Sequence, residues 1–509
     1  MKQLFHILLL LLGFTLQAQI TEQELDKVVE KTMSTFNVPG IAVAIVKDGK
    51  IVISKGYGVK SIKTKEKVDG NTLFGIASNS KAFTATALAI LVDEGKLNWD
   101  DKVIKYLPDF KMYNEYVTQE FTIRDLLTHR SGLGLGAGDL MIWPDGHNFT
   151  PKDIINNIQY LKPVSAFRTK YDYDNLLYVI AGEVVAKVSG KSWNDFVEER
   201  IMQPLDMKKS ASSWNRVQDT TNVIVPHVPV KGQLQIIKRY TNPIFDAAAG
   251  LYTNTNELSN WLIMQMNKGT YNGKRIVSEK QHKEMWTSQT IMPVRKLFPY
   301  TCNFDTYGLG WRLTDINGHL QVSHTGGLEG IVTQTMMFPD INLGIIVLTN
   351  QQSGAAFTAI SNTIKDRYYN FATTDHVERL GKNVQQNEDN DDKALAEVWN
   401  IVENNTKNKI TVQPHLYIGT YTDAWFGDVI ITEKKGKMYF ASVRSPKLAG
   451  ELFFYKENTF VVKWNTRTFN ADAYLYFNPS NKNFSMKAIS DLTDFSYDFQ
   501  DLYFTKKNN

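Results

Sequence analysis

The sequence predicts an α+β domain followed by a small all-β domain, and three observations support this prediction. A helix, a two-stranded hairpin and a second helix open the chain. Strand patterns joined by short turns begin at Tyr307, as in an antiparallel meander. After a charged stretch, residues 411–509 show short strand patterns with many aromatic residues, which is typical of a small barrel or sandwich.

The first helix is predicted to begin after Thr21, because Thr21 and Glu24 have the spacing of a capping box. Apolar residues then follow at helical spacing: Leu25, Val28, Val29, Met33 and Phe36. Two strand patterns come next, at 41–46 and 51–54. The pair Asp48-Gly49 between them is a hairpin signal.

Ser78 opens the second helix, which is rich in Ala and Leu and should end at Gly95. The helix carries few charges on any face, so we expect most of it to be buried. Ser78 and Lys81 are three residues apart and share one face of the helix. A lysine in a dry site has a lowered pKa and can activate a serine hydroxyl. Alone, however, Ser-x-x-Lys is more often a helix cap followed by a surface lysine.

The later part of the first domain is predicted to be a meander and a closing helix. The strand patterns cover 307–313, 320–325, 331–338 and 343–348, and the helix runs from about residue 355 to 369. Residues 371–410 have the polar, charged composition of a linker. We therefore expect a domain at 19–370, a charged linker at 371–410 and a β domain at 411–509.

The start of the chain resembles a secretory signal peptide. A basic start with Lys2 precedes a Leu-rich run from Leu8 to Leu12 and a small residue at Ala18. We expect cleavage after Ala18, and hence a secreted or periplasmic protein. The apolar run is too short to span a bilayer. The only cysteine, Cys302, cannot form an internal disulfide.

Charge and composition exclude some classes of function. The net charge of +4 is small and no long Lys/Arg run occurs, so we expect no nucleic-acid partner. No cluster of His, Cys or carboxylate residues has the spacing of a zinc site, and we expect neither metal nor cofactor.

Three motifs occur in the order found in the serine β-lactamase and penicillin-binding-protein superfamily. They are Ser78-x-x-Lys81, Tyr173-x-Asn175 and His324-Thr325-Gly326-Gly327. The chain resembles most closely the class C-like branch of β-lactamase-related serine hydrolases, over about residues 20 to 370. Residues 411–509 resemble the lipocalin-like β domain often appended in this branch. The resemblance implies an antiparallel sheet flanked by helices, an all-helical subregion and a small β-barrel.

The resemblance also assigns roles. Ser78 would attack a carbonyl and become acylated, and Tyr173, held ionised or nearly so by Lys81, would carry the proton. Asn175 would bind Lys81 and a substrate amide. The backbone N–H groups of Ser78 and Gly327 would form the oxyanion hole.

His324 stands where many relatives carry lysine, and with Thr325 and Gly326 it would contact substrate. At neutral pH, a histidine binds a carboxylate more weakly than a permanently charged lysine does. This substitution disfavours an optimised β-lactamase.

We therefore expect a serine hydrolase of esters or amides, with D-residue or cell-wall-derived peptides as candidate substrates. A true β-lactamase and a receptor or scaffold without turnover remain alternatives. A homo-oligomer formed through the C-terminal domain is also left open. Because the linker suggests independent folding, we expect a chain ending near Phe371 to keep its small-ester chemistry.

Overall fold

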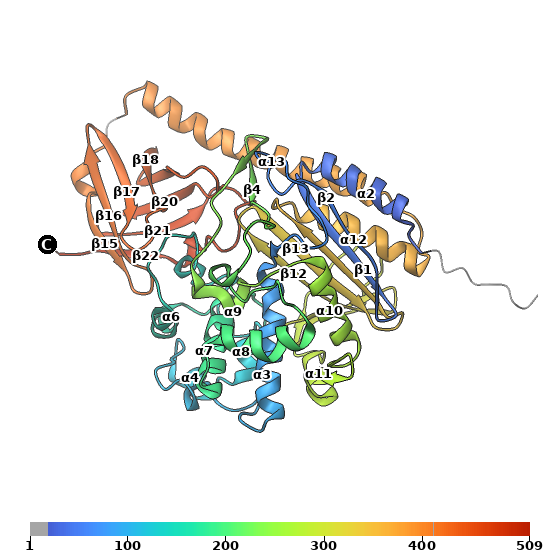
Figure 1. Ribbon diagram of the computed structural model, residues 1–509. Coiled ribbons are helices and arrows are strands. Elements are labelled where there is room, and N and C mark those ends of the chain that lie inside the picture. Colours follow the sequence, from blue (N-terminus) through green and yellow to red (C-terminus); the bar gives the residue numbers. More distant parts are fainter. Residues whose placement is uncertain (1–18, 411, 509) are drawn as a thin grey trace, which may run out of the picture.

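The computed structural model describes residues 19–410 and 412–508. The predicted signal peptide, residues 1–18, lies outside the described residues. Figure 1 shows a large sheet with helices on both faces, a helical region below it, and a barrel at the side. The long helix α13 (His376–Lys407) crosses from the sheet to the barrel. The predicted α+β class with a following β-barrel is thus confirmed.

An antiparallel sheet forms the centre of the larger part, with strand order β2-β1-β14-β13-β12-β11-β10-β9. The first hairpin and the later meander share this sheet because β1 pairs with β14, with Ile41 opposite Thr349. The strands are β1 (Gly40–Lys47), β2 (Lys50–Gly58), β9 (Thr290–Met292), β10 (Asp305–Tyr307), β11 (Arg312–Ile316), β12 (His319–Leu328), β13 (Ile331–Phe338) and β14 (Leu343–Thr349).

Two hydrophobic cores lie on the two faces of this sheet. Side chains alternate along β1, so that Ile41 and Val43 join the core under α2 (Glu22–Thr35) and α12 (Gly354–Tyr369). Ala42 and Ala44 face the larger core, which the helical region completes. The predicted capping box at Thr21 is present at the start of α2.

Helix α3 (Ser80–Asp93) is the axis of the helical region and is buried from Ser80 to Leu91, as its composition predicted. It packs against α7, α8, α9 and α11, while α10 covers β1 and β14. The remaining helices of this region are α4 (Glu115–Glu120), α5 (Ile123–Leu127), α6 (Pro151–Asn157), α7 (Leu176–Ser189), α8 (Trp193–Val197), α9 (Asp246–Ala249), α10 (Thr255–Met266) and α11 (Glu279–Met285).

The predicted strand at 307–313 is interrupted. Strand β10 ends at Tyr307 and β11 begins at Arg312. Gly310 has a φ of 78°, and a Cβ at Gly308 would meet the carbonyl oxygen of Met285 at 2.4 Å. The glycines thus form a turn that packs tightly against the end of α11, which alternation of apolar residues alone does not reveal.

The charged segment predicted as a linker is mostly one helix, α13, and the β domain after it is a closed barrel. Few residues of α13 are buried, so its composition resembles that of a solvated linker. The barrel strands are β15 (Gly419–Asp423), β16 (Gly427–Lys434), β17 (Lys437–Ser442), β18 (Ala449–Lys456), β19 (Thr459–Trp464), β20 (Ala473–Asn478), β21 (Asn483–Ala488) and β22 (Tyr503–Lys506).

The barrel is docked on the helical region by specific contacts. The carboxylate of Asp498 accepts hydrogen bonds from the backbone N–H groups of Gly138 at 2.6 Å and Leu140 at 3.0 Å. Arg444 forms an ion pair with Asp153 of α6 at 3.0 Å. Within the described residues, every helix is too short or too polar to cross a membrane.

Candidate active site

Ser78 lies in a single 3-10 turn, Ala77–Asn79, directly before α3, so the N–H groups of the helix start lie around it. Ala77 has a φ of 48°, in the left-handed region that residues with side chains rarely adopt. Neighbouring strands hold this turn, because the carbonyl of Ile76 accepts a hydrogen bond from Thr333 Oγ1 at 2.9 Å. The nucleophile candidate therefore projects from a fixed, strained turn.

Strand β12 passes this turn at close range. A Cβ on Gly326 would lie 2.2 Å from the carbonyl oxygen of Ile76, so only glycine permits this approach. A Cβ on Gly327 would meet no atom within 4 Å. Gly326 thus allows the strand to touch the turn, whereas Gly327 borders the open cleft beside Ser78.

Lys81 is completely buried next to Ser78. Its Nζ donates to Ser78 Oγ at 3.0 Å, to Asn175 Oδ1 at 2.7 Å and to the carbonyl of Ala248 at 3.1 Å. A lysine ammonium has three donors, and these contacts use all of them.

Burial lowers the pKa of Lys81 to about 7, and the charges of Asp139 and Asp174 oppose this shift. A neutral amine keeps two N–H donors and exposes one lone pair. The oxygens of Asn175 and Ala248 can only accept, so the two donors remain with them. The lone pair then points at the hydroxyl of Ser78, so a neutral Lys81 can accept a proton from Ser78.

Asn175 connects Lys81 to a buried carboxyl group and to the barrel. Its Nδ2 donates to Asp139 Oδ2 at 2.7 Å. The same Oδ2 accepts a hydrogen bond from Ser496 Oγ of the barrel at 2.9 Å. Burial and the neighbouring Asp174 carboxyl raise the pKa of Asp139 well above its ordinary value. Hydrogen bonds therefore link the barrel to the amine beside Ser78.

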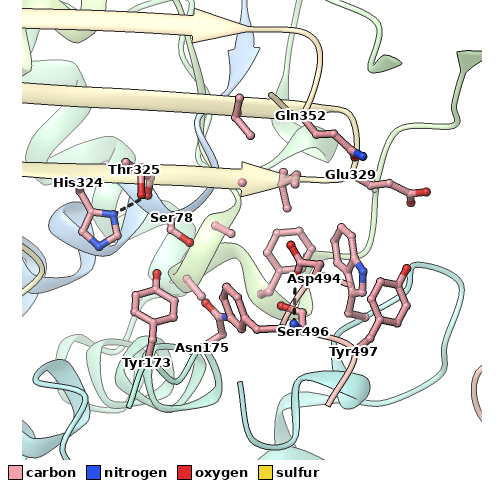
Figure 2. A pocket seen from close by; sticks show the side chains of 18 of the residues that line it. Ser78, Tyr173, Asn175, His324, Thr325, Glu329, Gln352, Asp494, Ser496 and Tyr497 are labelled. Carbon is pink, nitrogen blue, oxygen red and sulfur yellow. Dashed lines mark hydrogen bonds between the residues drawn. The ribbon is translucent and has the colours of Figure 1, made fainter. Parts of the chain in front are cut away.

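Tyr173 packs beside Lys81, whose Nζ lies 4.9 Å from the centre of the phenol ring. Figure 2 shows its hydroxyl directed toward Ser78. Burial raises the pKa of Tyr173 well above its ordinary value, although the hydrogen bond with Ser78 lowers it. The phenol is therefore protonated at neutral pH, unlike the ionised or nearly ionised state expected from sequence. The ring of His129 packs on Tyr173 with centroids 4.2 Å apart and fixes its position.

The contacts of His324 determine which of its nitrogens carries the proton. Its Nδ1 lies 2.7 Å from the carbonyl of Thr325, which can only accept, so Nδ1 carries the hydrogen. Nε2 then accepts from the hydroxyl of Tyr307 at 2.8 Å. Burial lowers the pKa of His324 to about 3, with the charge of Lys81 acting in the same direction. His324 is thus a neutral residue in the cleft wall, while Thr325 is exposed in the cleft.

Two guanidinium groups stand near His324. Arg295 and Arg312 both line the cleft and both contact the buried carboxylate of Asp305, at 2.8 Å and 3.3 Å. This end of the cleft therefore keeps one unbalanced positive charge, although His324 itself is neutral.

The catalytic candidates lie at a cavity of about 530 Å³. Ser78, Tyr173, Asn175, His324, Thr325 and Gly327 all line it, and the barrel closes the opposite side (Figure 2). Two barrel loops, 466–472 and 490–498, supply that wall. Phe495 of the second loop packs edge-on against Tyr173, with centroids 5.9 Å apart.

Comparison with known proteins gives a family for the larger part of the chain. The model of the beta-lactamase family matches residues 25–367. The chain belongs to the β-lactamase family. Residues 409–506 match a domain of unknown function (DUF3471), so the lipocalin-like character of the barrel stays a prediction.

Curated relatives of this β-lactamase-family protein include an unguisins hydrolase from Aspergillus campestris and protein flp from Staphylococcus aureus. The first is 26% identical over 68% of this chain and 65% of the relative. The second is 28% identical over 65% of this chain and 64% of the relative. The matches thus span slightly less than two thirds of those relatives.

Solved structures show the same fold. An octameric penicillin-binding protein homologue from Pyrococcus abyssi aligns over 96% of this chain and 100% of its own, with a TM-score of 0.62 and 21% identity. A penicillin-binding protein from Bacillus halodurans aligns over 66% of this chain and 98% of its own, with a TM-score of 0.54 and 21% identity.

The structure brings the predicted residues of this β-lactamase-family site together around one cavity, except that Lys81 is buried beneath Ser78 and Gly326 packs behind the cavity wall. Sequence reasoning missed Asp139, Ser496, Arg295 and Arg312. Asp139 lies in a loop whose only local signal is its glycines, and Ser496 reaches it across 357 positions. Among the described residues, no three His, Cys, Asp or Glu side chains are grouped to hold a metal ion.

Proposed function

We propose that this protein is a serine hydrolase that cleaves esters or amides through an acyl-enzyme at Ser78. One observation carries the proposal: buried Lys81 lies 3.0 Å from Ser78 Oγ, with its other two contacts fixed on oxygens that only accept. A serine hydroxyl next to a desolvated amine with a pKa of about 7 is an activated nucleophile. The family membership and the hydrolase among the curated relatives support it.

In the acylation step, neutral Lys81 takes the proton of Ser78 while Oγ attacks the substrate carbonyl carbon. The carbonyl oxygen gains negative charge, and the backbone N–H groups of Ser78 and Gly327 stabilise it. Each such donor is worth about 3 to 4 kcal/mol in the transition state. The open space at Gly327 leaves room for the substrate carbonyl between the two groups.

The leaving group needs a proton when its bond to the carbonyl carbon breaks. Tyr173 is protonated and its ring lies beside Lys81, so we assign it the donation to the leaving group. Lys81 then returns a proton to Tyr173. In deacylation, water loses a proton to Lys81 and attacks the acyl carbon. The bond between that carbon and Ser78 Oγ then breaks, and Lys81 passes the proton to Oγ.

The polar groups of the cleft favour neutral esters and amides over β-lactams. Neutral His324 cannot replace the permanent cation that many relatives carry at its position. Arg312 supplies a positive charge nearby, but its guanidinium contacts Asp305. A leaving group with a carboxylate is thus accepted without being required.

Export and assembly are proposed on separate grounds. Residues 1–18 have the signal-peptide pattern, so we propose a secreted or periplasmic protein. A homo-oligomer is proposed because one structural neighbour is described as an octamer. Light scattering on the purified chain tests the second proposal, and a monomer at all concentrations contradicts it.

The function is tested by comparing wild type with Ser78→Ala on p-nitrophenyl acetate, alanine p-nitroanilide and nitrocefin. We expect wild type to hydrolyse the ester and the anilide faster than nitrocefin, and Ser78→Ala to lose at least about a thousandfold in kcat. Residual ester activity above about a tenth of wild type contradicts the covalent mechanism. Stable labelling of Ser78 by a fluorescent penicillin without turnover supports a receptor instead.

A further inference from the structure

The two ends of the active-site cavity differ in charge. The basic residues that line it, Arg295 and Arg312, belong to the end of His324, because Arg312 pairs with Ser323 across β11 and β12. The opposite end carries two carboxylates. Glu329 follows β12, and Asp494 comes from the barrel loop 490–498; Figure 2 shows both on the far side of Ser78 from His324.

Neither carboxylate forms an ion pair with a basic side chain of the described residues, so both can still accept hydrogen bonds from a bound cation. Glu329 Oε1 accepts a hydrogen bond from the neutral hydroxyl of Thr468 at 2.8 Å. Asp494 Oδ1 accepts from the backbone N–H of Ser496 at 2.9 Å. Burial raises the pKa of the Glu329 carboxyl, so the free protein holds its charge at a cost that a bound cation would relieve. Asp494 is exposed, so its carboxylate is open to a cation in the cavity.

Tyr497 adds an independent polar group at this end. Its side chain is 5% exposed, and its hydroxyl makes no hydrogen bond of ordinary geometry among the described residues, although the Trp143 indole is near enough to lower its pKa. Burial raises the pKa of Tyr497 well above its ordinary value, and the charges of Glu329 and Asp494 act in the same direction. Figure 2 shows the ring at the cavity wall with its hydroxyl on the side of Glu329. A phenol oxygen can accept a hydrogen bond from an ammonium group.

The other charged groups near Glu329 do not change the sign of the net charge at this end of the cavity. Lys447 lowers the pKa of Glu329 by its positive charge, and Asp145 raises it by its negative charge. These two groups oppose each other. The charges of Glu329 and Asp494 therefore leave this end of the cavity negative.

The proposed mechanism determines which part of the substrate lies at the Glu329 end of the cavity. Tyr173, the proposed donor to the leaving group, stands at the His324 end, with ring centroids 6.3 Å apart. The leaving group must therefore point toward His324. The acyl part, on the other side of the scissile carbonyl, extends toward Glu329. Strand residues rise about 3.3 Å each, so Glu329 is roughly 7 Å along the chain from Gly327, within reach of a short acyl substituent.

We propose that Glu329, Asp494 and Tyr497 form a subsite for a protonated amine on the acyl part of the substrate. The proposal rests on the proposed function, because it uses the direction of the leaving group. It narrows the substrates to esters and amides of amino-substituted acids, such as short peptides with a free amino end. The barrel then contributes directly to substrate choice, because two of the three residues belong to it.

Binding to the full-length Ser78→Ala variant tests the subsite without turnover. Matched p-nitroanilides are compared by calorimetry: both enantiomers of alanine against isobutyrate, and β-alanine against butyrate. Each pair replaces an ammonium by a methyl group at one position. We expect the amine member of at least one pair to bind tenfold or more tightly than its neutral partner. Equal affinities in every pair, or no binding of any amine member, overturn the proposal.

Variants that remove one charge then identify the residues responsible for the preference for amine ligands. In the Ser78→Ala background, Glu329→Gln and Asp494→Asn should each reduce the affinity ratio of the preferred pair by threefold or more. Asp491→Asn is the matched control, because it removes a carboxylate from the same loop that does not line the cavity. A ratio that all three variants leave unchanged overturns the assignment to these residues.

Hydrolysis by wild type separates the two proposals. If wild type binds as expected but cleaves neither member of any pair, the subsite stands and the proposed hydrolase function fails for these substrates. If wild type cleaves both members at equal kcat/KM and shows no preference in binding, the hydrolase function stands and the subsite fails.

Discussion

At the scale of single residues, the proposed chemistry depends on the protonation state of Lys81. Its three contacts are satisfied both as an ammonium and as an amine, but only the amine can accept the proton of Ser78. Burial lowers the pKa of Lys81, whereas the charges of Asp139 and Asp174 raise it. The site thus balances desolvation against two carboxyl groups to place the amine near neutrality.

This balance predicts the pH dependence. We expect kcat/KM for a non-ionisable ester to fall below a pH of about 7, where Lys81 is protonated. Burial also raises the pKa of Asp174 to about 7, so the acidic limb of the pH profile reports the joint titration of Lys81 and Asp174. Asp174→Asn removes a charge that favours the ammonium, and the limb should move to lower pH.

The substitution Asp174→Asn keeps the oxygen that accepts the Leu176 N–H at 2.9 Å, so the start of α7 should survive. Asp172→Asn is the control, since Asp172 belongs to the same loop but lies outside the charges acting on Lys81. The measurement is the pH profile of kcat/KM for the three proteins. A limb that stays in place or moves to higher pH in Asp174→Asn contradicts the assignment of the base.

The sequence predicts the centre of this site but not its support. Ser78 and Lys81 are neighbours on one helix face, so local spacing reveals them. Tyr173, Asn175 and His324 could be predicted only as ordered motifs of a family. Asp139 could not, because its role comes from a contact with Asn175 and from Ser496 at the far end of the chain. The protonation of Tyr173 and His324 depends on burial, which a motif does not encode.

At the scale of elements, the contact between β12 and the Ser78 turn determines the shape of the cleft. Gly326 and Gly327 are adjacent in sequence but face different surroundings, since β-strand side chains alternate. One position packs against the backbone of Ile76 and the other opens to the cavity. A glycine pair in a sequence suggests close approach, but not which member of the pair makes it.

This difference predicts contrasting effects of two alanine substitutions. Gly326→Ala places a Cβ 2.2 Å from the Ile76 carbonyl oxygen, so the turn or the strand must shift. We expect a loss of about 1 to 3 kcal/mol in the free energy of unfolding, as in overpacked cores, and slower acylation of Ser78. Gly327→Ala should keep wild-type stability, because its Cβ meets nothing within 4 Å. Thermal unfolding and single-turnover acylation measure both effects, and equal melting temperatures would refute the packing argument.

The 32-residue helix α13 shows how composition can hide an element. Its segment is polar and charged because few of its residues meet a core, so the sequence favours a linker. Its end nevertheless packs on the barrel, where Asn405 donates to the carbonyl of Tyr455 at 2.7 Å. Asp391 in its middle accepts a hydrogen bond from Ser490 Oγ at 2.5 Å. The helix therefore holds the beginning of the barrel loop that lines the cavity.

At the scale of the whole molecule, the barrel forms one wall of the cavity beside Ser78. The sequence favours a catalytic domain that works without it, since the charged linker suggests independent folding. The contacts of Asp498 and Ser496 with the loop around Asp139 give the opposite expectation. A chain ending near Phe371 should lose small-ester activity because Asn175 and Lys81 lose their support.

A less drastic change tests the same point. Asp498→Ala leaves the buried N–H groups of Gly138 and Leu140 without an acceptor, which costs about 1 to 3 kcal/mol. We expect kcat on p-nitrophenyl acetate to fall, because the Asp139 loop loosens. Asp498→Asn retains one acceptor oxygen and should be intermediate. Kinetics and thermal unfolding of both variants check this. An unchanged kcat with a lowered melting temperature would mean that the barrel contributes to stability but not to catalysis.

The hydrogen bond between Ser496 and Asp139 also bears on when activity arises during protein synthesis. The nucleophile at Ser78 leaves the ribosome early, but the wall of its cavity includes residues that are made more than 400 positions later. Contacts between such distant positions form late, because a long loop must close first. A partly made chain therefore holds an exposed Ser78 without the machinery that activates it, and a messenger truncated before codon 498 encodes a protein without a finished site.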